Sequence, residues 1–324
     1  MYLNSFSDGL TPLDMTTLEE FQSLLASARD LGIPHATDVR YHSRNTVISH
    51  QRFHFLEWGE PGATPVVLLH GGNQSAHSWD LVSLHLADRY HVFALDQRGH
   101  GDSEWNRGAD YSIEAMARDV EGFLAVCGIE RPVIFGHSMG GMVALALTHQ
   151  RPKLARGAVL VDVGPEISES GTRLIGEFVH KNIEFDDMEE FLDRVEKYDP
   201  YRTRVHMQRT LKYNLLRRAD GRYVSKTDRR RFLSKDEQDR PRLRGAPGLD
   251  ELGDMKFPVL VVRGGDSNVL LEEPAERFAA ALPEGRLVTV PDCGHNVHSQ
   301  NTLGFLDATA LFLDALQDRE TERA

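Results

Sequence analysis

Residues 133–147 read VIFGHSMGGMVALAL, and this stretch decides the fold. An apolar strand pattern runs into Ser138, which has a glycine two positions away on each side, and a run of helix-forming residues follows. A sharp strand-to-helix turn requires small residues at those two positions, because larger side chains would collide with the strand and the helix. Such a turn lifts the serine hydroxyl clear of the sheet, towards the free N–H groups of the new helix. The pentapeptide alone is a weak signal, so its meaning depends on its surroundings.

Strand and helix patterns alternate along most of the chain. This alternation is typical of βαβ units and predicts an α/β protein with a mostly parallel sheet. The apolar runs are short and continuous, as expected for strands that are covered on both faces. The expected strands are residues 52–58, 65–70, 91–96, 131–137, 157–163, 257–264 and 285–292. The expected helices are residues 76–89, 112–127, 139–150, 273–282 and 302–316.

The alternation of strand and helix patterns is interrupted once, and this interruption suggests that the chain has three regions. Residues 165–255 contain polar helical stretches and the segment ADGRYVSKTD, whose DG turn predicts a small hairpin. We expect this insertion to form a cap over the carboxyl ends of the strands. The core then comprises residues 39–164 and 256–324. Residues 1–38 form a helical arm, and its apolar side could pack on the core, on the cap or on a partner subunit.

The composition and net charge argue against some classes of function. The chain has 324 residues, 40% of them hydrophobic, and a net charge of −12, so we expect no general affinity for nucleic acid or anionic membranes. The charge is uneven, since residues 194–244 contain 17 Lys or Arg against 7 Asp or Glu. This basic stretch could be a solvated helical surface, or it could be a rim that attracts acidic substrates.

The cysteines and the N-terminus indicate the cellular compartment that we expect for the protein. Cys127 and Cys293 are far apart and match no metal-binding spacing, and two cysteines in a chain of this length suggest a reducing compartment. The N-terminus has no basic region followed by an apolar run, so we expect no signal peptide, and no apolar stretch is long enough to span a membrane. We therefore expect a cytoplasmic protein, with no metal and no cofactor.

A serine nucleophile needs a base, and the base needs a carboxylate. His295 follows the last expected strand, and Asp266 follows the strand at 257–264, so both lie at the same sheet edge as Ser138. Each has a rival. His298 is three residues beyond His295, and Asp162 ends the strand at 157–163. We expect Ser138, Asp266 and His295 to form the catalytic triad, with Asp162 as the alternative acid.

An acyl-transfer site also needs donors for the oxyanion. One candidate is the backbone N–H of Met139, directly after the nucleophile. The second is the N–H of Gly72, in the turn HGGN at residues 70–73. Asn73, His137 and Trp105 are further candidates for the substrate pocket. The loop DQRGHGDSEW at residues 96–105 is glycine-rich but lacks the lysine and spacing of a phosphate-binding loop, so we expect a structural loop beside the site.

Five segments together carry a resemblance. HGGN, DQRGHGDS, GHSMGG, VRGGDS and DCGH occur in this order, and with them the chain resembles enzymes of the α/β-hydrolase fold that have a cap domain. The resemblance covers about residues 50–318. It implies an eight-stranded sheet, a helical cap and a serine-esterase mechanism with Ser138, Asp266 and His295 at the triad positions. Haloalkane dehalogenases and epoxide hydrolases of similar sequence use an aspartate nucleophile, so Ser138 disfavours both.

We therefore expect a serine hydrolase that cleaves carboxylic esters of small to medium size through an acyl-enzyme intermediate. The alternatives are a lactonase, a C–C bond hydrolase or a cofactor-free perhydrolase or haloperoxidase with the same triad. A non-catalytic ligand-binding member of the fold is the third possibility. The expected partner is a small-molecule ester or lactone, and a homodimer is possible.

Overall fold

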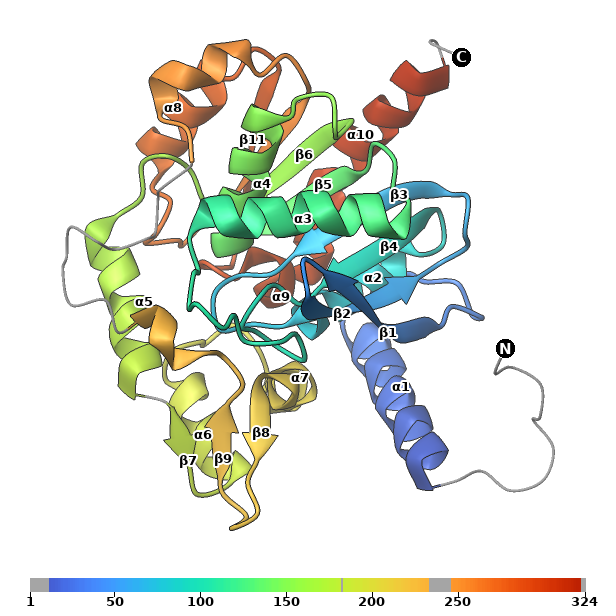
Figure 1. Cartoon of the computed structure of the whole chain (residues 1–324), viewed down its shortest axis with the longest axis vertical. Coiled ribbons are helices and arrows are strands. Elements are labelled where there is room, and N and C mark those ends of the chain that lie inside the picture. Colours follow the sequence, from blue (N-terminus) through green and yellow to red (C-terminus); the bar gives the residue numbers. More distant parts are fainter. Residues whose placement is uncertain (1–11, 182, 233–245, 322–324) are drawn as a thin grey trace.

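An eight-stranded sheet runs through the centre of the computed structural model, which describes residues 12–181, 183–232 and 246–321 (Figure 1). The strand order is β1-β2-β4-β3-β5-β6-β10-β11. Strands β1 and β2 are antiparallel to their neighbours, and the remaining strands pair in parallel, which confirms the predicted mostly parallel eight-stranded sheet. The strands are β1 Tyr41–Ile48, β2 Gln51–Trp58, β3 Thr64–Leu69, β4 Tyr90–Leu95, β5 Val133–His137, β6 Gly157–Val161, β10 Val259–Gly264 and β11 Gly285–Val290.

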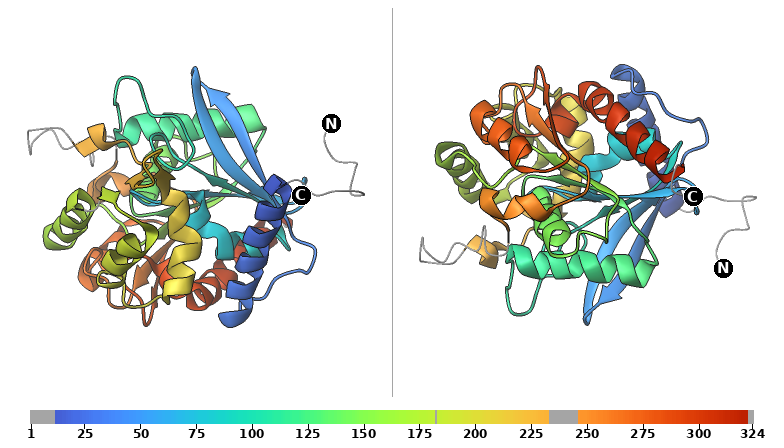
Figure 2. Two further views of the ribbon diagram at one scale, coloured as in Figure 1. Left: turned by 90° about the horizontal axis from the view of Figure 1, so that it is seen from below. Right: turned by 90° about the horizontal axis from the view of Figure 1, so that it is seen from above.

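Helices cover both faces of this sheet (Figure 2). One face carries α3 (Ile113–Cys127), α4 (Met139–Gln150) and α8 (Glu272–Ala281), whose apolar residues share a core with the strands. The other carries α1 (Pro12–Asp30), the short helices η1 (Ala76–Trp79) and α2 (Asp80–Leu86), α9 (Val297–Gln300) and α10 (Thr302–Thr321). Helix α4 is apolar all round because it lies between α3 and the sheet.

The ends of α3 show how local sequence sets an element. The Ser112 side chain accepts a hydrogen bond from the Ala115 N–H and caps the first turn. Gly128 ends the helix in a left-handed conformation, with φ of 64°, that favours glycine. The helix predicted at 112–127 therefore begins and ends where its capping residues lie.

The segment between β6 and β10 builds a separate layer at the lower left of Figure 1. It contains α5 (Glu169–Lys181), α6 (Met188–Glu196), α7 (Arg204–Leu211) and a sheet of β7 (Glu184–Phe185), β9 (Tyr223–Ser225) and β8 (Leu215–Arg217). Strands β8 and β9 form the predicted antiparallel hairpin. The layer has a small core of its own, made by Phe185, Phe191, Leu192, Val195, Met207 and Leu215. We call this layer the cap.

The described part of the segment also contains three short helices: η2 (Lys212–Asn214), η3 (Arg229–Phe232) and η6 (Leu249–Asp254). Helix η6 packs with the sheet and not with the cap, because Leu252 and the following Met255 are buried in the core beside α8. Residues 233–245, which belong to the segment expected to form the cap, lie outside the described residues.

Helix α1 packs on its own chain. Phe21, Leu24 and Ala28 are buried in the core on the α2 and α10 side of the sheet. Its polar side reaches the cap, where Glu20 accepts a hydrogen bond from Lys212 Nζ at 3.1 Å. The helix therefore bridges core and cap. Residues 1–11, on which the expectation of no signal peptide rests, are outside the described ranges. Within those ranges, no helix combines the length and the apolar character needed to cross a membrane.

Candidate active site

Ser138 lies at the turn between β5 and α4. Its backbone has φ of 51° and ψ of −116°, a strained conformation for a residue with a side chain. A Cβ on Gly136 would lie 2.4 Å from the carbonyl oxygen of Gly140. A Cβ on Gly140 would lie 2.4 Å from that of Leu69 in β3. Both distances are too short for a carbon atom beside a carbonyl oxygen, so the sharp turn that exposes Ser138 requires glycine at these two positions.

His295 lies in the loop after β11 and connects two side chains. Its Nε2 is 3.0 Å from Ser138 Oγ, and its Nδ1 is 2.7 Å from Asp162 Oδ2. An ionised carboxylate only accepts hydrogen bonds, so Nδ1 carries the proton and Nε2 is left to accept from the serine hydroxyl. The three side chains form a continuous hydrogen-bonded chain from hydroxyl to carboxylate, and this is the geometry of a nucleophile, a base and an orienting acid.

Asp162 directly follows β6, which pairs with β5 in the sheet. Its side chain is fully buried, and its backbone has φ of 50°. Besides His295, two groups donate to its carboxylate: the Ser267 hydroxyl at 2.5 Å from Oδ2 and the Gly264 N–H at 3.1 Å from Oδ1. A buried carboxylate with three donors is satisfied as an ion, which fits the orienting role.

The expectation that Asp266 orients the histidine is wrong. Its side chain is exposed and accepts a hydrogen bond from the Tyr201 hydroxyl of the cap at 3.2 Å. The loop after β10 turns so that Ser267, one residue further on, points inward to Asp162. The structure instead brings the alternative acid, Asp162, to His295, and Asp162 also keeps the chain order of serine, acid and histidine.

The two neighbouring histidines lie behind the site. His298 is fully buried, its ring stacks on Trp79 at 4.0 Å between centroids, and burial lowers the pKa of His298 to about 3. His137 is also buried, and its Nε2 lies 2.9 Å from the carbonyl oxygen of His295. A carbonyl only accepts, so His137 donates and fixes the backbone of the His295 loop. His137 therefore supports the His295 loop, and its place on a substrate pocket stays a prediction.

The two expected oxyanion donors are available for a ligand. Met139 is the first residue of α4, so its N–H has no partner within the helix. Neither this N–H nor that of Gly72 donates a hydrogen bond to another group among the described residues. The neighbouring Gly71 N–H, in contrast, is used, since it donates to Gln74 Oε1 at 2.9 Å. Asn73 lies in the same turn with φ of 60°.

Three further hydrogen bonds fix this turn. The backbone N–H of Gln97 donates to His70 Nε2 at 3.0 Å, and Gln97 Nε2 donates to the His70 carbonyl at 2.6 Å. Gln74 Nε2 donates to Asn296 Oδ1 at 3.0 Å, beside His295. The glycine-rich loop and the histidine loop thus hold the turn between them, and none of these polar contacts could be read from the sequence pattern.

The cap supplies one charged group to the site. Arg231, in η3, places Nη2 3.2 Å from the sulfur of Met139 and donates through Nη1 to His100 Nε2. Its Nη atoms lie 3.7 and 3.8 Å from the position that a Cβ on Gly72 would take. The sequence indicates only a basic stretch here and does not single out Arg231.

Trp105 contacts a segment of the cap. Its side chain is about half exposed, and its indole N–H donates to the backbone carbonyl of Lys226 at 2.7 Å. The residue thus holds a cap segment on the loop after β4. Its place in the substrate pocket stays a prediction.

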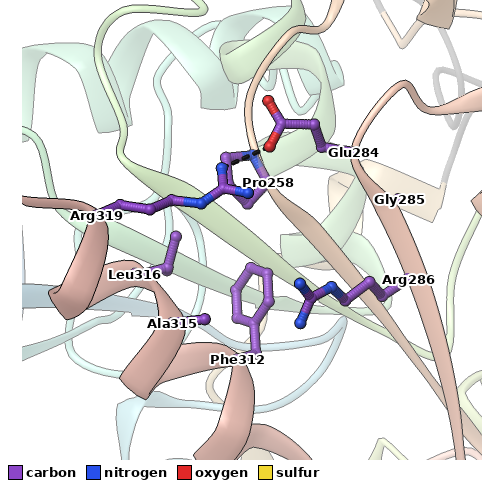
Figure 3. A pocket seen from close by; sticks show the side chains of 8 residues that line it. All are labelled: Pro258, Glu284, Gly285, Arg286, Phe312, Ala315, Leu316 and Arg319. Carbon is purple, nitrogen blue, oxygen red and sulfur yellow. Dashed lines mark hydrogen bonds and ion pairs between the residues drawn. The ribbon is translucent and has the colours of Figure 1, made fainter.

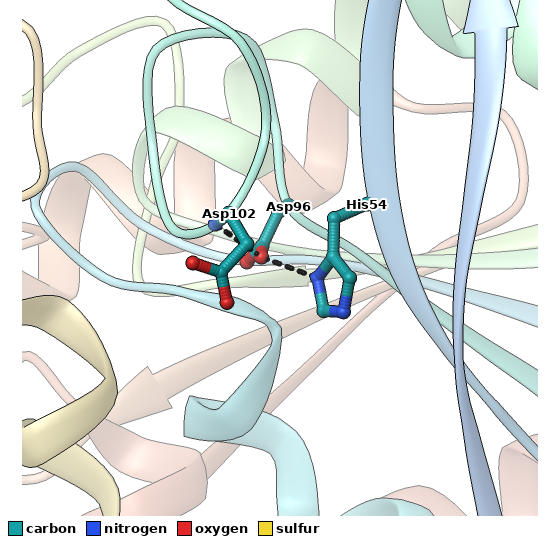
Figure 4. A group of neighbouring side chains, drawn as sticks. All are labelled: His54, Asp96 and Asp102. Carbon is teal, nitrogen blue, oxygen red and sulfur yellow. Dashed lines mark hydrogen bonds and ion pairs between the residues drawn. The ribbon is translucent and has the colours of Figure 1, made fainter.

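One cluster has residue types that could bind a metal ion: His54, Asp96 and Asp102 (Figure 4). His54 Nδ1 is 2.7 Å from Asp96 Oδ2, which also accepts from the Asp102 N–H at 2.9 Å. Asp96 Oδ1 accepts from the Ala76 N–H, and Asp102 pairs with Lys226. These contacts anchor the loop after β4, so the cluster is explained as structural.

A surface pocket lies elsewhere (Figure 3). It is lined by Pro258 and Gly285, at the amino ends of β10 and β11, and by Phe312, Leu316 and Arg319 of α10. Ser138, Asp162 and His295 all follow the carboxyl ends of their strands. The pocket is thus at the opposite edge of the sheet and takes no part in the site.

Known proteins with similar sequences include hydrolases. A family model described as the alpha/beta hydrolase family matches residues 66–308. Esterase Rv0045c of Mycobacterium tuberculosis is 27% identical over 93% of this chain and 98% of its own length, and its crystal structure superimposes with a TM-score of 0.69. A 3-hydroxybutyrate-oligomer hydrolase of Cupriavidus necator is 30% identical over 75% of this chain and 87% of its own. The crystal structure of E-2-(acetamidomethylene)succinate hydrolase, 21% identical, covers 85% of this chain with a TM-score of 0.76 and shows the fold alone.

Proposed function

The chain belongs to the alpha/beta hydrolase family, and we propose that within this family it hydrolyses carboxylic esters through an acyl-enzyme intermediate on Ser138. One observation carries the proposal: the hydrogen-bonded chain from Ser138 Oγ through His295 to the buried Asp162. A serine hydroxyl is a weak nucleophile until a base removes its proton, and His295 Nε2 is in position to do so.

In the first half of the reaction, Ser138 Oγ attacks the ester carbonyl carbon while its proton passes to His295 Nε2. The negative charge that develops on the carbonyl oxygen is stabilised by the N–H groups of Met139 and Gly72. Asp162 stabilises the imidazolium that forms. When the tetrahedral intermediate collapses, His295 returns the proton to the leaving alcohol, and the acyl group stays on the serine.

In the second half, a water molecule takes the place of the alcohol. His295 removes a proton from the water, whose oxygen attacks the acyl carbon, and the same two N–H groups stabilise the second oxyanion. Collapse returns the proton to Ser138 Oγ and releases the carboxylic acid. The side chains thus end in their starting protonation states.

The relatives support an ester as the substrate class. The Mycobacterium tuberculosis relative is named an esterase, and the Cupriavidus necator relative is named for hydrolysis of 3-hydroxybutyrate oligomers. In the latter, the bond between units is itself an ester. An ester hydrolase needs no group beyond the nucleophile, the base, the acid and the oxyanion donors, and all four have candidates in this chain.

The test is hydrolysis of p-nitrophenyl butyrate by the wild type and by Ser138→Ala. We expect the variant to lose at least about 10³-fold in kcat, because residual catalysis rests on the oxyanion donors alone. Ser170→Ala, at an exposed serine of α5, is the control and should retain full activity. A fluorophosphonate probe should label the wild type and the control but not Ser138→Ala. Equal activity of all three proteins would refute the proposal.

A further inference from the structure

Gln74 ends the turn that carries the expected oxyanion donor Gly72, and its side chain is half-buried. Both ends of its carboxamide are used. Oε1 accepts from the Gly71 N–H at 2.9 Å, and Nε2 donates to Asn296 Oδ1 at 3.0 Å. Asn296 lies 222 residues further along the chain and directly follows His295. One amide therefore joins the turn with an oxyanion donor to the loop with the candidate base.

These contacts fix the orientation of the carboxamide. A backbone N–H only donates, so the atom that faces Gly71 is the oxygen, and the NH₂ group faces Asn296. The oxygen also lies 3.2 Å from His137 Nδ1. A Cβ on Gly71 would lie 3.0 Å from Gln74 Oε1 and 2.6 Å from His137 Nδ1. Glycine at position 71 therefore leaves the room in which the amide and the imidazole pack against the turn.

The direction of the Gly72 N–H depends on the same turn. The peptide bond between Gly71 and Gly72 is trans and planar, so its N–H points opposite to the Gly71 carbonyl. That carbonyl accepts from the Gln74 N–H at 3.3 Å and lies 2.7 Å from His70 Nδ1. Gln74 thus holds both backbone polar groups of Gly71, one through its side chain and the other through its own N–H. The Gly72 N–H consequently points away from these partners.

Three consecutive residues of the histidine loop each form a hydrogen bond with a side chain outside the loop. The pairs are Gly294 N–H to Gln300 Oε1 at 2.8 Å, His137 Nε2 to the His295 carbonyl at 2.9 Å, and Gln74 Nε2 to Asn296 Oδ1 at 3.0 Å. Of these three side chains, that of Gln74 alone belongs to the turn with an expected oxyanion donor. Its amide therefore sets the spacing between this donor and His295.

We propose that Gln74 is a positioning residue, whose carboxamide keeps the Gly72 N–H and the His295 imidazole at the spacing that the tetrahedral intermediate requires. This inference rests on the proposed function, because both groups act on that intermediate. The N–H stabilises the oxyanion, and the imidazole moves the proton between Ser138 and the leaving alcohol. Gln74 acts through these two groups and not on the reacting atoms.

The expected effect is one of position. Removal of an oxyanion donor costs about 10²–10³-fold in kcat, and a misplacement of about 1 Å can cost about 10²-fold. Loss of the Gln74 amide frees two segments but removes neither group, so we expect kcat to fall by about 10- to 100-fold. The oxyanion contact is strongest in the transition state, so KM should change by less than about threefold.

The first experiment compares p-nitrophenyl butyrate hydrolysis by the wild type, Gln74→Met and the control Gln150→Met. Methionine has the length of glutamine but neither polar group, so Gln74→Met loses both contacts of the amide. Gln150 is the exposed last residue of α4, and its variant should match the wild type. The end point of fluorophosphonate labelling gives the concentration of reactive sites, so kcat is obtained per site and a merely structural loss is separated from a catalytic one.

A second measurement reports on the tetrahedral state directly. Propylboronic acid forms a tetrahedral adduct with a serine hydroxyl and has the same alkyl chain as the butyryl group. We expect its inhibition constant for Gln74→Met to rise by the same factor as kcat/KM falls, within about threefold, because both depend on the geometry of the tetrahedral state.

Asn296→Ala and the double variant isolate the bridge between the two segments. Asn296→Ala removes only the outer contact, so kcat should fall by about three- to tenfold. Both single changes remove the same hydrogen bond, so their effects should not add, and the double variant should stay within about twofold of Gln74→Met. If Gln74→Met does not fold, Asn296→Ala still tests the bridge.

Four results would overturn the inference. They are a wild-type kcat per labelled site in Gln74→Met, a wild-type kcat in Asn296→Ala, losses that add in the double variant, and an unchanged affinity for propylboronic acid when kcat falls. Each of these leaves ester hydrolysis intact. A wild type that neither reacts with the fluorophosphonate probe nor hydrolyses any ester refutes the proposed function itself.

Discussion

Exchange of the two candidate acids gives the sharpest test of the site. Asp162→Asn and Asp266→Asn each replace a carboxylate by an amide of the same shape, at positions 2.7 Å from His295 Nδ1 and 3.2 Å from the Tyr201 hydroxyl, respectively. The structure predicts that only the first change disables the base. The second should leave turnover within about threefold, because the lost contact is an exposed one.

The magnitude follows from the partners of Asp162. Three donors meet its two oxygens, but an asparagine offers one oxygen and one NH₂. If the amide oxygen faces His295, the NH₂ confronts the Gly264 N–H, which cannot rotate away. If the oxygen faces Gly264, the NH₂ confronts His295, which can change its tautomer. The second arrangement is the less costly, and it puts the proton on Nε2, where it faces Ser138.

A histidine with its proton on Nε2 cannot accept the serine proton, and the amide no longer balances the imidazolium charge. In a protease with the same constellation, the corresponding change costs about 10⁴-fold in kcat, and we expect a loss of this order here. The loss corresponds to about 5 kcal/mol of transition-state stabilisation.

The assay is p-nitrophenyl butyrate hydrolysis by the wild type, Asp162→Asn and Asp266→Asn, with urea unfolding of all three proteins. Unfolding is needed because Asp162 also holds two loop groups, and its loss costs about 1–3 kcal/mol of stability. A folded Asp162→Asn that retains more than a tenth of the activity, or an Asp266→Asn that loses more than a hundredfold, would refute the assignment of Asp162.

Three further predictions follow from named contacts. Ser267→Ala removes one donor from Asp162 without a change of charge, so kcat should fall by about tenfold with little change in KM, and an unchanged kcat would show that this hydroxyl does not support the acid. Arg209→Met leaves Asp80 buried without the cation that lies 2.9 Å from it, so urea unfolding should show a loss of about 3–5 kcal/mol, and a loss below 1 kcal/mol would contradict this. The buried His298 has a pKa of about 3, whereas a histidine in the unfolded chain has a pKa of about 6.5 and binds a proton below that pH, so the free energy of unfolding falls as the pH falls. Between pH 7.5 and 5, His298→Phe should therefore lose about 2 kcal/mol less of its free energy of unfolding than the wild type. Equal losses in the two proteins would contradict the lowered pKa.

The buried part of the sheet could be predicted because burial on both faces leaves a direct mark on the sequence. The strands β3 to β6 and β10 are continuous apolar runs, and the structure has them close to the predicted bounds. Strand β1 carries no such mark. Its sequence, YHSRNTVI, is polar, and most of its residues are exposed at the edge of the sheet. It forms because its backbone pairs with β2 through a tight connection, which hydrophobic patterning does not record.

The sequence predicts those residues of the candidate site that directly follow the ends of predicted strands. Ser138 and His295 follow from strand positions and from the need of a hydroxyl for a base. The two candidate acids, Asp162 and Asp266, also follow strand ends, and the choice between them depends on which side chain the loop after β10 turns inward. Three backbone hydrogen bonds set that turn, and spacing alone does not reveal them: Gly265 N–H to the Val290 carbonyl, Asp266 N–H to the Cys293 carbonyl and Ser267 N–H to the Gly264 carbonyl. Arg231 was equally hidden, since a charge run does not show which of its members faces the site.

Because Asp162, directly after β6, contacts His295, the loop after β10 can make other contacts. Ser267 still supports the acid from this loop, while Asp266 faces outward and binds Tyr201 of the cap. The cap is also held through Arg209 on Asp80 and through residues 226–231 on the loop after β4. These attachments join the cap to the loop after β10, to α2 and to the loop after β4. A cap attached in this way can hold a side chain such as Arg231 next to the expected oxyanion donors without ordering it at each turnover.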